Sequence, residues 1–196
     1  MWRPFRLTRL LALLRNFLTL SFVFAAVAFF WSFFGFLAPE TATPIEVSIT
    51  NLLLAEITGH ILFGLVAAIP SRDWGTILLC GANAVLIDSD HLLSAAGFPV
   101  LTRLAHSLLF VLLAGTILAL FSKRTGRSDL VFASAASAVL AHFSFDALAG
   151  DGAFPFFAPL TFDFYAVPWL SWIPFEVLAG ALLFIVSSRR RIQIRI

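Results

Sequence analysis

The sequence predicts an all-α, polytopic membrane helical bundle of about six transmembrane helices, with both termini in the cytoplasm. Of its 196 residues, 60% are hydrophobic and only 12% are charged, whereas about a quarter of a soluble domain is charged. The apolar residues form continuous runs of helical length rather than the alternating pattern of barrel strands. Basic residues gather in clusters beside these runs. Together these features indicate lipid as the surrounding solvent.

Six apolar runs have about the 20 residues that a helix needs to cross a bilayer core of about 30 Å. Segments containing proline, glycine or charged residues separate them. The first is expected to be a retained helix rather than a cleaved signal peptide, whose apolar region has only about 7–15 residues. The last starts at Pro168 or at Pro174, since proline suits a first helical turn. The runs are 17–37, 52–69, 75–96, 104–121, 130–149 and 168–187.

Lysine and arginine predict the orientation of this bundle, because cytoplasmic loops are rich in both. With the N-terminus inside, 12 of the 13 basic residues fall on the cytoplasmic side. The exception is Arg103, at the opposite face. The basic clusters are therefore interpreted as topology signals, and no nucleic-acid partner is expected.

Acidic and histidine side chains interrupt the predicted helices near their extracytoplasmic ends, and all four histidines are among them. An ionised side chain at a helix centre costs roughly 2.5–3.5 kcal/mol, so these groups must pair, bind a cation or line a wet cavity. Carboxylates outnumber the single nearby arginine, which favours a divalent metal. The residues are Glu56, His60, Asp88, Asp90, His91, Arg103, His106, His142, Asp146 and Glu176.

Four pairs among these residues are spaced so that both members share one face of a helix. A single pair is weak support, because an isolated histidine in a membrane helix is more often a packing or hydrogen-bonding residue. Four pairs at one depth indicate a site, and carboxylate with imidazole suits zinc, manganese or iron. The pairs are Glu56 with His60, Asp88 with His91, Arg103 with His106, and His142 with Asp146.

The order of these motifs resembles that in the YdjM-type LexA-regulated inner-membrane metal-dependent hydrolases, over about residues 52–185. That family is distantly similar to zinc-dependent phospholipase C enzymes. Thr102, Leu104 and Ala105 depart from the family pattern of histidine, glycine and threonine. The matching motifs are Thr-Gly-His60, Ile-Asp88-Ser-Asp90-His91, Arg103-Leu-Ala-His106-Ser107 and His142-Phe-Ser-Phe-Asp146, followed by a loop rich in glycine, phenylalanine and proline.

The resemblance implies a multi-pass protein of a prokaryotic inner membrane that forms one integral membrane domain, 1–196. Within it, 1–51 would hold the first helix and an outer loop, 52–187 the hydrolase-like core and 188–196 a basic cytoplasmic tail. One or two divalent ions, zinc first among them, are the expected cofactor.

Roles follow for the individual side chains, in part from this resemblance. The expected direct ligands are His60, Asp88, His142 and Asp146. Asp90, His91 and His106 would complete a second metal site or support the first, and His106 could also act in catalysis. Glu56 or Asp90 is the expected general base, Arg103 the clamp for an anionic group, and Ser107 and Glu176 are additional candidates.

A site at headgroup depth favours a lipid-like ester or phosphoester, so membrane lipids and an anionic substrate are the expected partners. The aromatic loop 151–166 is interpreted either as a lid beside a lipid substrate or as an interfacial aromatic belt. Three alternatives stay open. They are a metal or proton transporter, a metal-independent lipid phosphatase with a histidine nucleophile, and a haem-binding cytochrome. Ala136 stands where that phosphatase class needs arginine.

Overall fold

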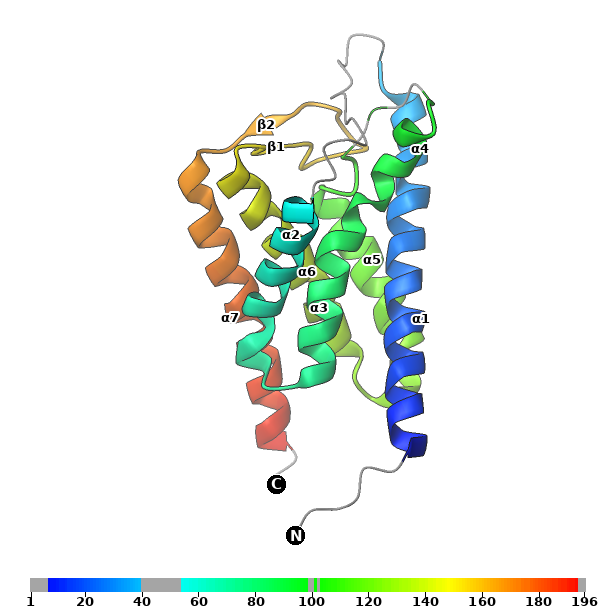
Figure 1. Cartoon of the computed structure of the whole chain (residues 1–196), viewed down its shortest axis with the longest axis vertical. Coiled ribbons are helices and arrows are strands. Elements are labelled where there is room, and N and C mark those ends of the chain that lie inside the picture. The colour runs from blue at the N-terminus through cyan, green and yellow to red at the C-terminus, as the bar shows by residue number, and fades with distance from the viewer. Residues whose placement is uncertain (1–6, 40–53, 99–100, 102, 194–196) are drawn as a thin grey trace.

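A computed structural model describes residues 7–39, 54–98, 101 and 103–193 of the protein. Its long helices lie side by side, with α1 and α7 at opposite edges of the bundle (Figure 1). The all-α prediction is confirmed for the described chain, whose strands are confined to one short ribbon. These helices are α1 (Leu7–Trp31), α2 (Leu54–Ala68), α3 (Trp74–Leu86), α5 (Leu108–Phe121), α6 (Ser128–Ala149) and α7 (Trp172–Gln193).

Short elements extend or connect the helices. The ribbon is antiparallel, pairs β1 (Ala153–Phe154) with β2 (Tyr165–Ala166), and crosses the end of the bundle opposite the start of α1 and the end of α7 (Figure 1). One further helix, α4 (Leu92–Ala95), is a single turn. The 3-10 segments are η1 (Ser32–Leu37), η3 (Ile69–Ser71), η4 (Ile87–His91), η5 (Lys123–Thr125) and η6 (Trp169–Ser171).

Four of the described helical segments are long and apolar enough to cross a membrane. The expected span 75–96 is not continuous, because α3 ends at Leu86 and a 3-10 segment follows. The expected span 104–121 begins only at Leu108, which leaves an apolar helix too short for this class. The four segments are Leu11–Leu37, Leu54–Ser71, Ser128–Ala149 and Trp169–Ile192.

Helix α6 is the centre of the bundle. It packs against α2, α3, α5 and α7, and 83% of its apolar stretch is buried, against 28% or less in the other three membrane-length helices. Alanine and serine predominate along it, so neighbouring helices can approach closely, as at helix interfaces in membranes. The outer helices instead expose large apolar side chains such as Phe22, Leu62 and Val177, as lipid-facing surfaces do.

The first helix belongs to this core. Phe24 and Ala28 of α1 are fully buried, and the Phe24 ring meets Phe110 of α5 edge to face at 5.5 Å. The indole N–H of Trp31 donates to the carbonyl of Leu104 at 3.0 Å. Helix α1 is thereby bound to the segment that precedes α5.

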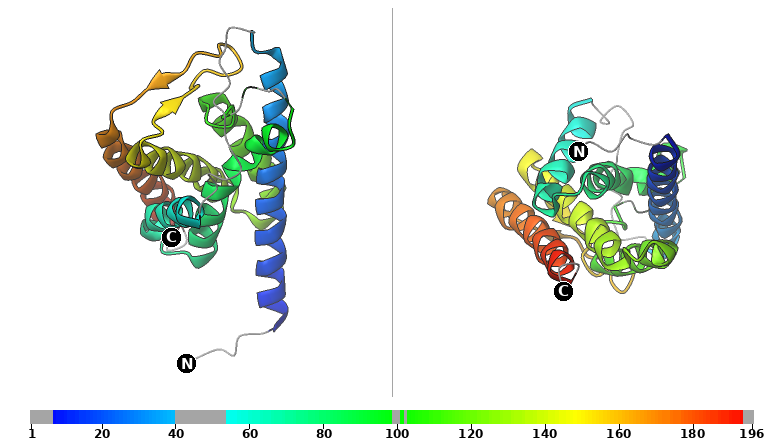
Figure 2. Two further views of the ribbon diagram at one scale, coloured as in Figure 1. Left: turned by 45° about the horizontal axis from the view of Figure 1, so that its top comes forward. Right: turned by 90° about the horizontal axis from the view of Figure 1, so that it is seen from below.

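Basic residues mark one end of the bundle. The start of α1, the α2–α3 and α5–α6 connections and the end of α7 all lie there, away from the ribbon (Figure 1; Figure 2 gives two further views). The expected basic tail is helical as far as Gln193, and Arg190 in it donates from Nε to both oxygens of Asp129, at 2.7 and 2.9 Å. Arg3, Arg6 and Arg195 lie outside the described residues.

Helices α2 and α3 touch at Gly64. A Cβ built at this position would lie 2.7 Å from the Cys80 carbonyl oxygen and 2.8 Å from the Ala84 Cβ. Backbones can approach this closely only where the side chain is a hydrogen atom. Gly64 therefore sets the spacing between the two helices that carry His60 and the Asp88 segment.

Gly64→Leu should lower the free energy of unfolding by about 1–3 kcal/mol, the usual range for overpacking. The matched control is Gly180→Ala in α7, where an added Cβ meets its nearest neighbours at 3.6 and 3.7 Å. Thermal unfolding in detergent compares the two variants with the parent. Equal midpoints for all three would contradict the close contact between α2 and α3.

Asp73 begins α3 at the basic end. Its carboxylate accepts from the backbone N–H and the hydroxyl of Thr76, at 2.8 and 2.7 Å, and pairs with Arg127 at 2.6 Å. Partial burial raises the pKa of Asp73, but the bonds from Thr76 and the guanidinium of Arg127 outweigh it and hold that pKa below its usual value. This ion pair joins the α3 start to the α5–α6 connection.

Asp73→Asn should make unfolding less sensitive to acid. Because its folded pKa is lowered, ionised Asp73 stabilises the fold above its unfolded pKa of about 4, and that stabilisation disappears as pH falls through the lower folded pKa. Melting midpoints measured from pH 7 downward should fall more steeply for the parent than for the variant. Parallel curves would count against the role of Asp73.

Candidate metal centre

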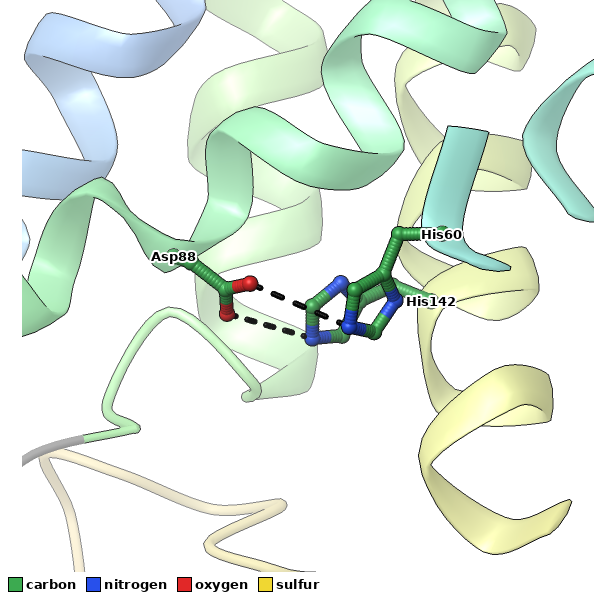
Figure 3. A group of neighbouring side chains, drawn as sticks. All are labelled: His60, Asp88 and His142. Carbon is green, nitrogen blue, oxygen red and sulfur yellow. Dashed lines mark ion pairs between the residues drawn. The ribbon is translucent and has the colours of Figure 1, made fainter. Parts of the chain in front are cut away.

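Eight ionisable side chains predicted from the sequence meet around η4 and the second half of α6, elements that lie nearer the ribbon than the basic end (Figure 1). His60 comes from α2, Asp88 from η4 and His142 from α6, and the three point toward one another in Figure 3. The sequence analysis predicted that all of these side chains lie on helices. In the structure, Arg103 and His106 lie instead in the turn that precedes α5. The cluster consists of His60, Asp88, Asp90, His91, Arg103, His106, His142 and Asp146.

His142 is held in one tautomer by the backbone. Its Nδ1 lies 2.6 Å from the carbonyl oxygen of Ala84, and a carbonyl only accepts, so Nδ1 donates. The neutral ring then carries its lone pair on Nε2, which faces the cluster. Backbone carbonyls commonly orient metal-binding histidines in this way.

Three atoms lie around His142 Nε2 at distances close to those between metal ligands. His142 Nε2 lies 3.5 Å from Asp88 Oδ1 and 3.4 Å from Asp146 Oδ2. His106 Nε2 lies 2.8 Å from His142 Nε2, 3.6 Å from Asp146 Oδ2 and 3.9 Å from Asp88 Oδ1. Neighbouring ligand atoms on a tetrahedral zinc, each about 2.0–2.1 Å from the ion, are about 3.3–3.4 Å apart. His106, His142 and Asp146 therefore form a group whose ligand atoms could hold a metal ion, and Asp88 lies beside both of its imidazoles.

His60 faces the other oxygens of the same two carboxylates. Its Nε2 lies 3.4 Å from Asp146 Oδ1 and 3.8 Å from Asp88 Oδ2. The His60 ring stacks on His142 with 3.8 Å between centroids and 6° between planes, and Phe145 meets its face at 4.6 Å. Asp88 and Asp146 thus each direct one carboxylate oxygen toward His142 and the other toward His60.

Asp90 lies behind the cluster and is fully buried. One carboxylate oxygen accepts from the backbone N–H of Ala105 at 2.9 Å and lies 3.7 Å from Nδ1 of His106. The other lies 3.4 Å from His91 Nε2, which is also 3.5 Å from Asp88 Oδ1. These contacts suit an orienting role for Asp90 better than the general-base role considered from the sequence.

Arg103 supplies the one cation of the cluster. Its guanidinium donates to the carboxylate of Asp146, lies 5.4 Å above the centre of the Phe154 ring, and is only 8% exposed. Its backbone is in the left-handed region, with φ of 66°, a conformation that costs a non-glycine residue about 1–2 kcal/mol.

The charge of the cluster suits a divalent ion. Three carboxylates, those of Asp88, Asp90 and Asp146, stand against the one guanidinium of Arg103. With neutral imidazoles, this leaves two negative charges beside apolar helices, and an uncompensated charge there is expensive.

Three predicted candidates lie outside this contact set. Glu56 is one turn before His60 on α2, and Glu176 is on α7; neither forms an ion pair with the cluster among the residues that the structure describes. Ser107 caps α5, its hydroxyl accepting from the N–H of Phe110 at 3.2 Å. A helix starting at residue 104 was therefore a wrong prediction, since 103–107 form a turn that ends at this cap.

Sequence reasoning missed the groups that support the cluster. Phe154 and Phe145 pack on Arg103 and His60, and the backbone of Ala84 and Ala105 bonds to His142 and Asp90. For Phe145, the sequence contained one indication of a close contact beside His60. Gly59 precedes His60 inside a helix, and a Cβ there would lie 2.1 Å from the Phe145 ring.

Comparison of the chain with protein-family models, with curated proteins and with solved structures finds no match. The resemblance to YdjM-type hydrolases therefore rests on the motifs alone.

Arg103→Met should lower the free energy of unfolding of metal-free protein by about 3–5 kcal/mol, because Asp146 would be left buried without its cation. Added Zn²⁺ should restore part of the loss by supplying positive charge at the same carboxylates. The control is Arg124→Met, an exposed residue at the basic end. Chelator-treated protein is melted with and without zinc, and equal loss in both variants would refute the pairing.

Proposed function

We propose that the protein is a membrane-embedded, metal-dependent hydrolase whose site faces the extracytoplasmic side of a prokaryotic inner membrane. The observation that carries the proposal is that two imidazoles face the same two carboxylates: His142 Nε2 lies 3.5 and 3.4 Å from Asp88 Oδ1 and Asp146 Oδ2, and His106 Nε2 lies 3.9 and 3.6 Å from the same two oxygens. These imidazole–carboxylate distances suit ligands of one ion better than direct hydrogen bonds, most of which are shorter than 3.2 Å.

Zinc is the preferred ion, with manganese or iron as alternatives, since two imidazoles and two carboxylates suit all three. His106 takes the ligand position that the sequence analysis had assigned to His60. His60, with Asp88 and Asp146, would then hold a second ion or a water. A bound divalent ion supplies a water acidic near pH 7 and polarises a carbonyl or phosphoryl oxygen.

The open side of the site is at Asp88, whose side chain is 19% exposed, whereas that of Asp90 is fully buried. Glu56 lies on the His60 face of α2, four residues earlier, and is partly exposed. It is therefore the better placed general base. Arg103 neutralises Asp146 and, as the one described cation at this end, draws the anionic part of a substrate.

The surroundings favour an amphipathic substrate. Phe154 in the loop 151–166 is buried against the cluster, whereas Phe157 is 47% and Leu160 76% exposed. Leu54 at the start of α2 is 79% exposed. A polar site beside apolar, lipid-accessible side chains suits a lipid-like ester or phosphoester.

Purified protein should contain at least one equivalent of zinc, manganese or iron per chain, measured by inductively coupled plasma mass spectrometry. His142→Ala and Asp88→Ala should each lose most of it, because each removes a ligand. Asp129→Ala is the control, since Asp129 pairs with Arg190 at the opposite end. Parent protein without metal above background, after growth in and dialysis against zinc, would disprove the metal centre.

Hydrolysis is measured separately on mixed micelles of phospholipids and on a chromogenic phosphodiester. A metal-dependent hydrolase should be stopped by chelator and restarted by zinc, and Glu56→Gln should slow turnover while leaving the metal content unchanged. Chelator-resistant turnover would instead favour a phosphatase with a histidine nucleophile. Metal or proton flux in proteoliposomes without hydrolysis would favour a transporter.

A further inference from the structure

A cavity lies at the basic end of the bundle, away from the metal centre. It has a volume of about 410 Å³ and is enclosed by α1, the start of α3, the α5–α6 connection and the start of α6. This is within the roughly 300–1,000 Å³ of ligand pockets. None of the eight cluster residues lines it.

Apolar and polar side chains both line this cavity, and one of the polar groups, the Ser134 hydroxyl, has no partner in the described part of the chain. Leu20, Leu79 and Val131 are among its apolar lining. Ser134 lines it from α6, is only 1% exposed, and its hydroxyl has no hydrogen-bond partner in the described part of the chain. A buried hydroxyl without a partner costs about 1–3 kcal/mol, so a ligand acceptor beside Ser134 would remove that penalty.

Arg15 provides the charge. It lines the cavity from α1, is exposed, and forms no ion pair with any described residue. Arg127, the other arginine on the lining, is already paired with Asp73 at 2.6 Å. The cavity therefore combines the guanidinium of Arg15, which has no ion-pair partner among the described residues, with apolar side chains and the buried hydroxyl of Ser134.

We propose that this cavity binds an anionic phospholipid. The phosphate pairs with Arg15, an acyl chain lies along the apolar wall, and an ester carbonyl accepts from the Ser134 hydroxyl. Basic pockets between helices on the cytoplasmic side recognise acidic headgroups in this way, and guanidinium binds phosphate through two parallel hydrogen bonds. A small polar solute would leave the apolar wall uncompensated, and a metal cation would be repelled by Arg15.

The test uses the full chain in detergent, titrated with phosphatidylglycerol or phosphatidylcholine and followed by native mass spectrometry. We expect one phosphatidylglycerol per chain, bound about tenfold or more tighter than phosphatidylcholine, as hydrogen bonds to charged groups contribute about 1.5–3 kcal/mol. Arg15→Gln should remove this preference. Arg124→Gln, an exposed neighbour outside the cavity, changes the same charge and should keep it.

Ser134→Ala should weaken phosphatidylglycerol binding about threefold, the value of one neutral hydrogen bond. As the folding control, its melting midpoint without lipid should be no lower than that of the parent, since the variant loses a buried hydroxyl that has no partner among the described residues. Equal affinity for the two lipids, or equal weakening by Arg15→Gln and Arg124→Gln, would overturn the proposal. So would a cavity that binds no lipid. The metal content of the Arg15 and Ser134 variants should equal that of the parent. The lipid-binding result can therefore be judged independently of the proposed hydrolase activity.

Discussion

The burial of charge among apolar helices is the constraint on which this structure depends. Three carboxylates and a guanidinium lie at one end of a bundle whose exterior is suited to lipid, and none of them can be left without compensation. Arg103 meets Asp146, and Ala105 donates to Asp90. The histidines contact the carboxylates and one another. Contacts within the cluster therefore add to the packing of the helices in fixing its geometry.

Close helix packing makes this cluster possible. The small side chains of α6 let α2 and α3 approach it, and Gly64 brings α2 against α3. The ring of His142 can then reach the carbonyl of Ala84 across the α3–α6 contact. Packing, rather than a dedicated binding loop, thus determines the tautomer of the central imidazole.

Much of the site could be predicted, because charge in apolar helices must be compensated wherever it occurs. That argument alone brought all four histidines and Asp88, Asp90 and Asp146 together, as the structure has them. It could not locate the change after Leu86 to a 3-10 segment, with about three residues per turn, which brings Asp88 and His91 onto one side of η4.

Backbone details were also beyond the sequence. The left-handed backbone of Arg103 accompanies its tertiary contacts to Asp146 and Phe154, and the Ser107 side chain caps α5 four residues later. The apolar run had predicted a helix over 104–121, which includes Ser107. The expected count of six spans is not confirmed within the described chain, where four helical segments are long and apolar enough to cross a membrane. The length of an apolar run does not record where polar groups draw the backbone out of a helix.

The separation of the two ends has an electrical consequence. With the basic end in the cytoplasm, as proposed, the cluster lies part-way into the membrane on the side from which an inside-negative potential pulls cations inward. Full passage is worth about 2.3 kcal/mol per elementary charge at 100 mV, so a divalent ion that reaches the cluster gains a fraction of twice that value. An energised membrane would therefore load this site more tightly than a depolarised one, which links occupancy to the energetic state of the cell.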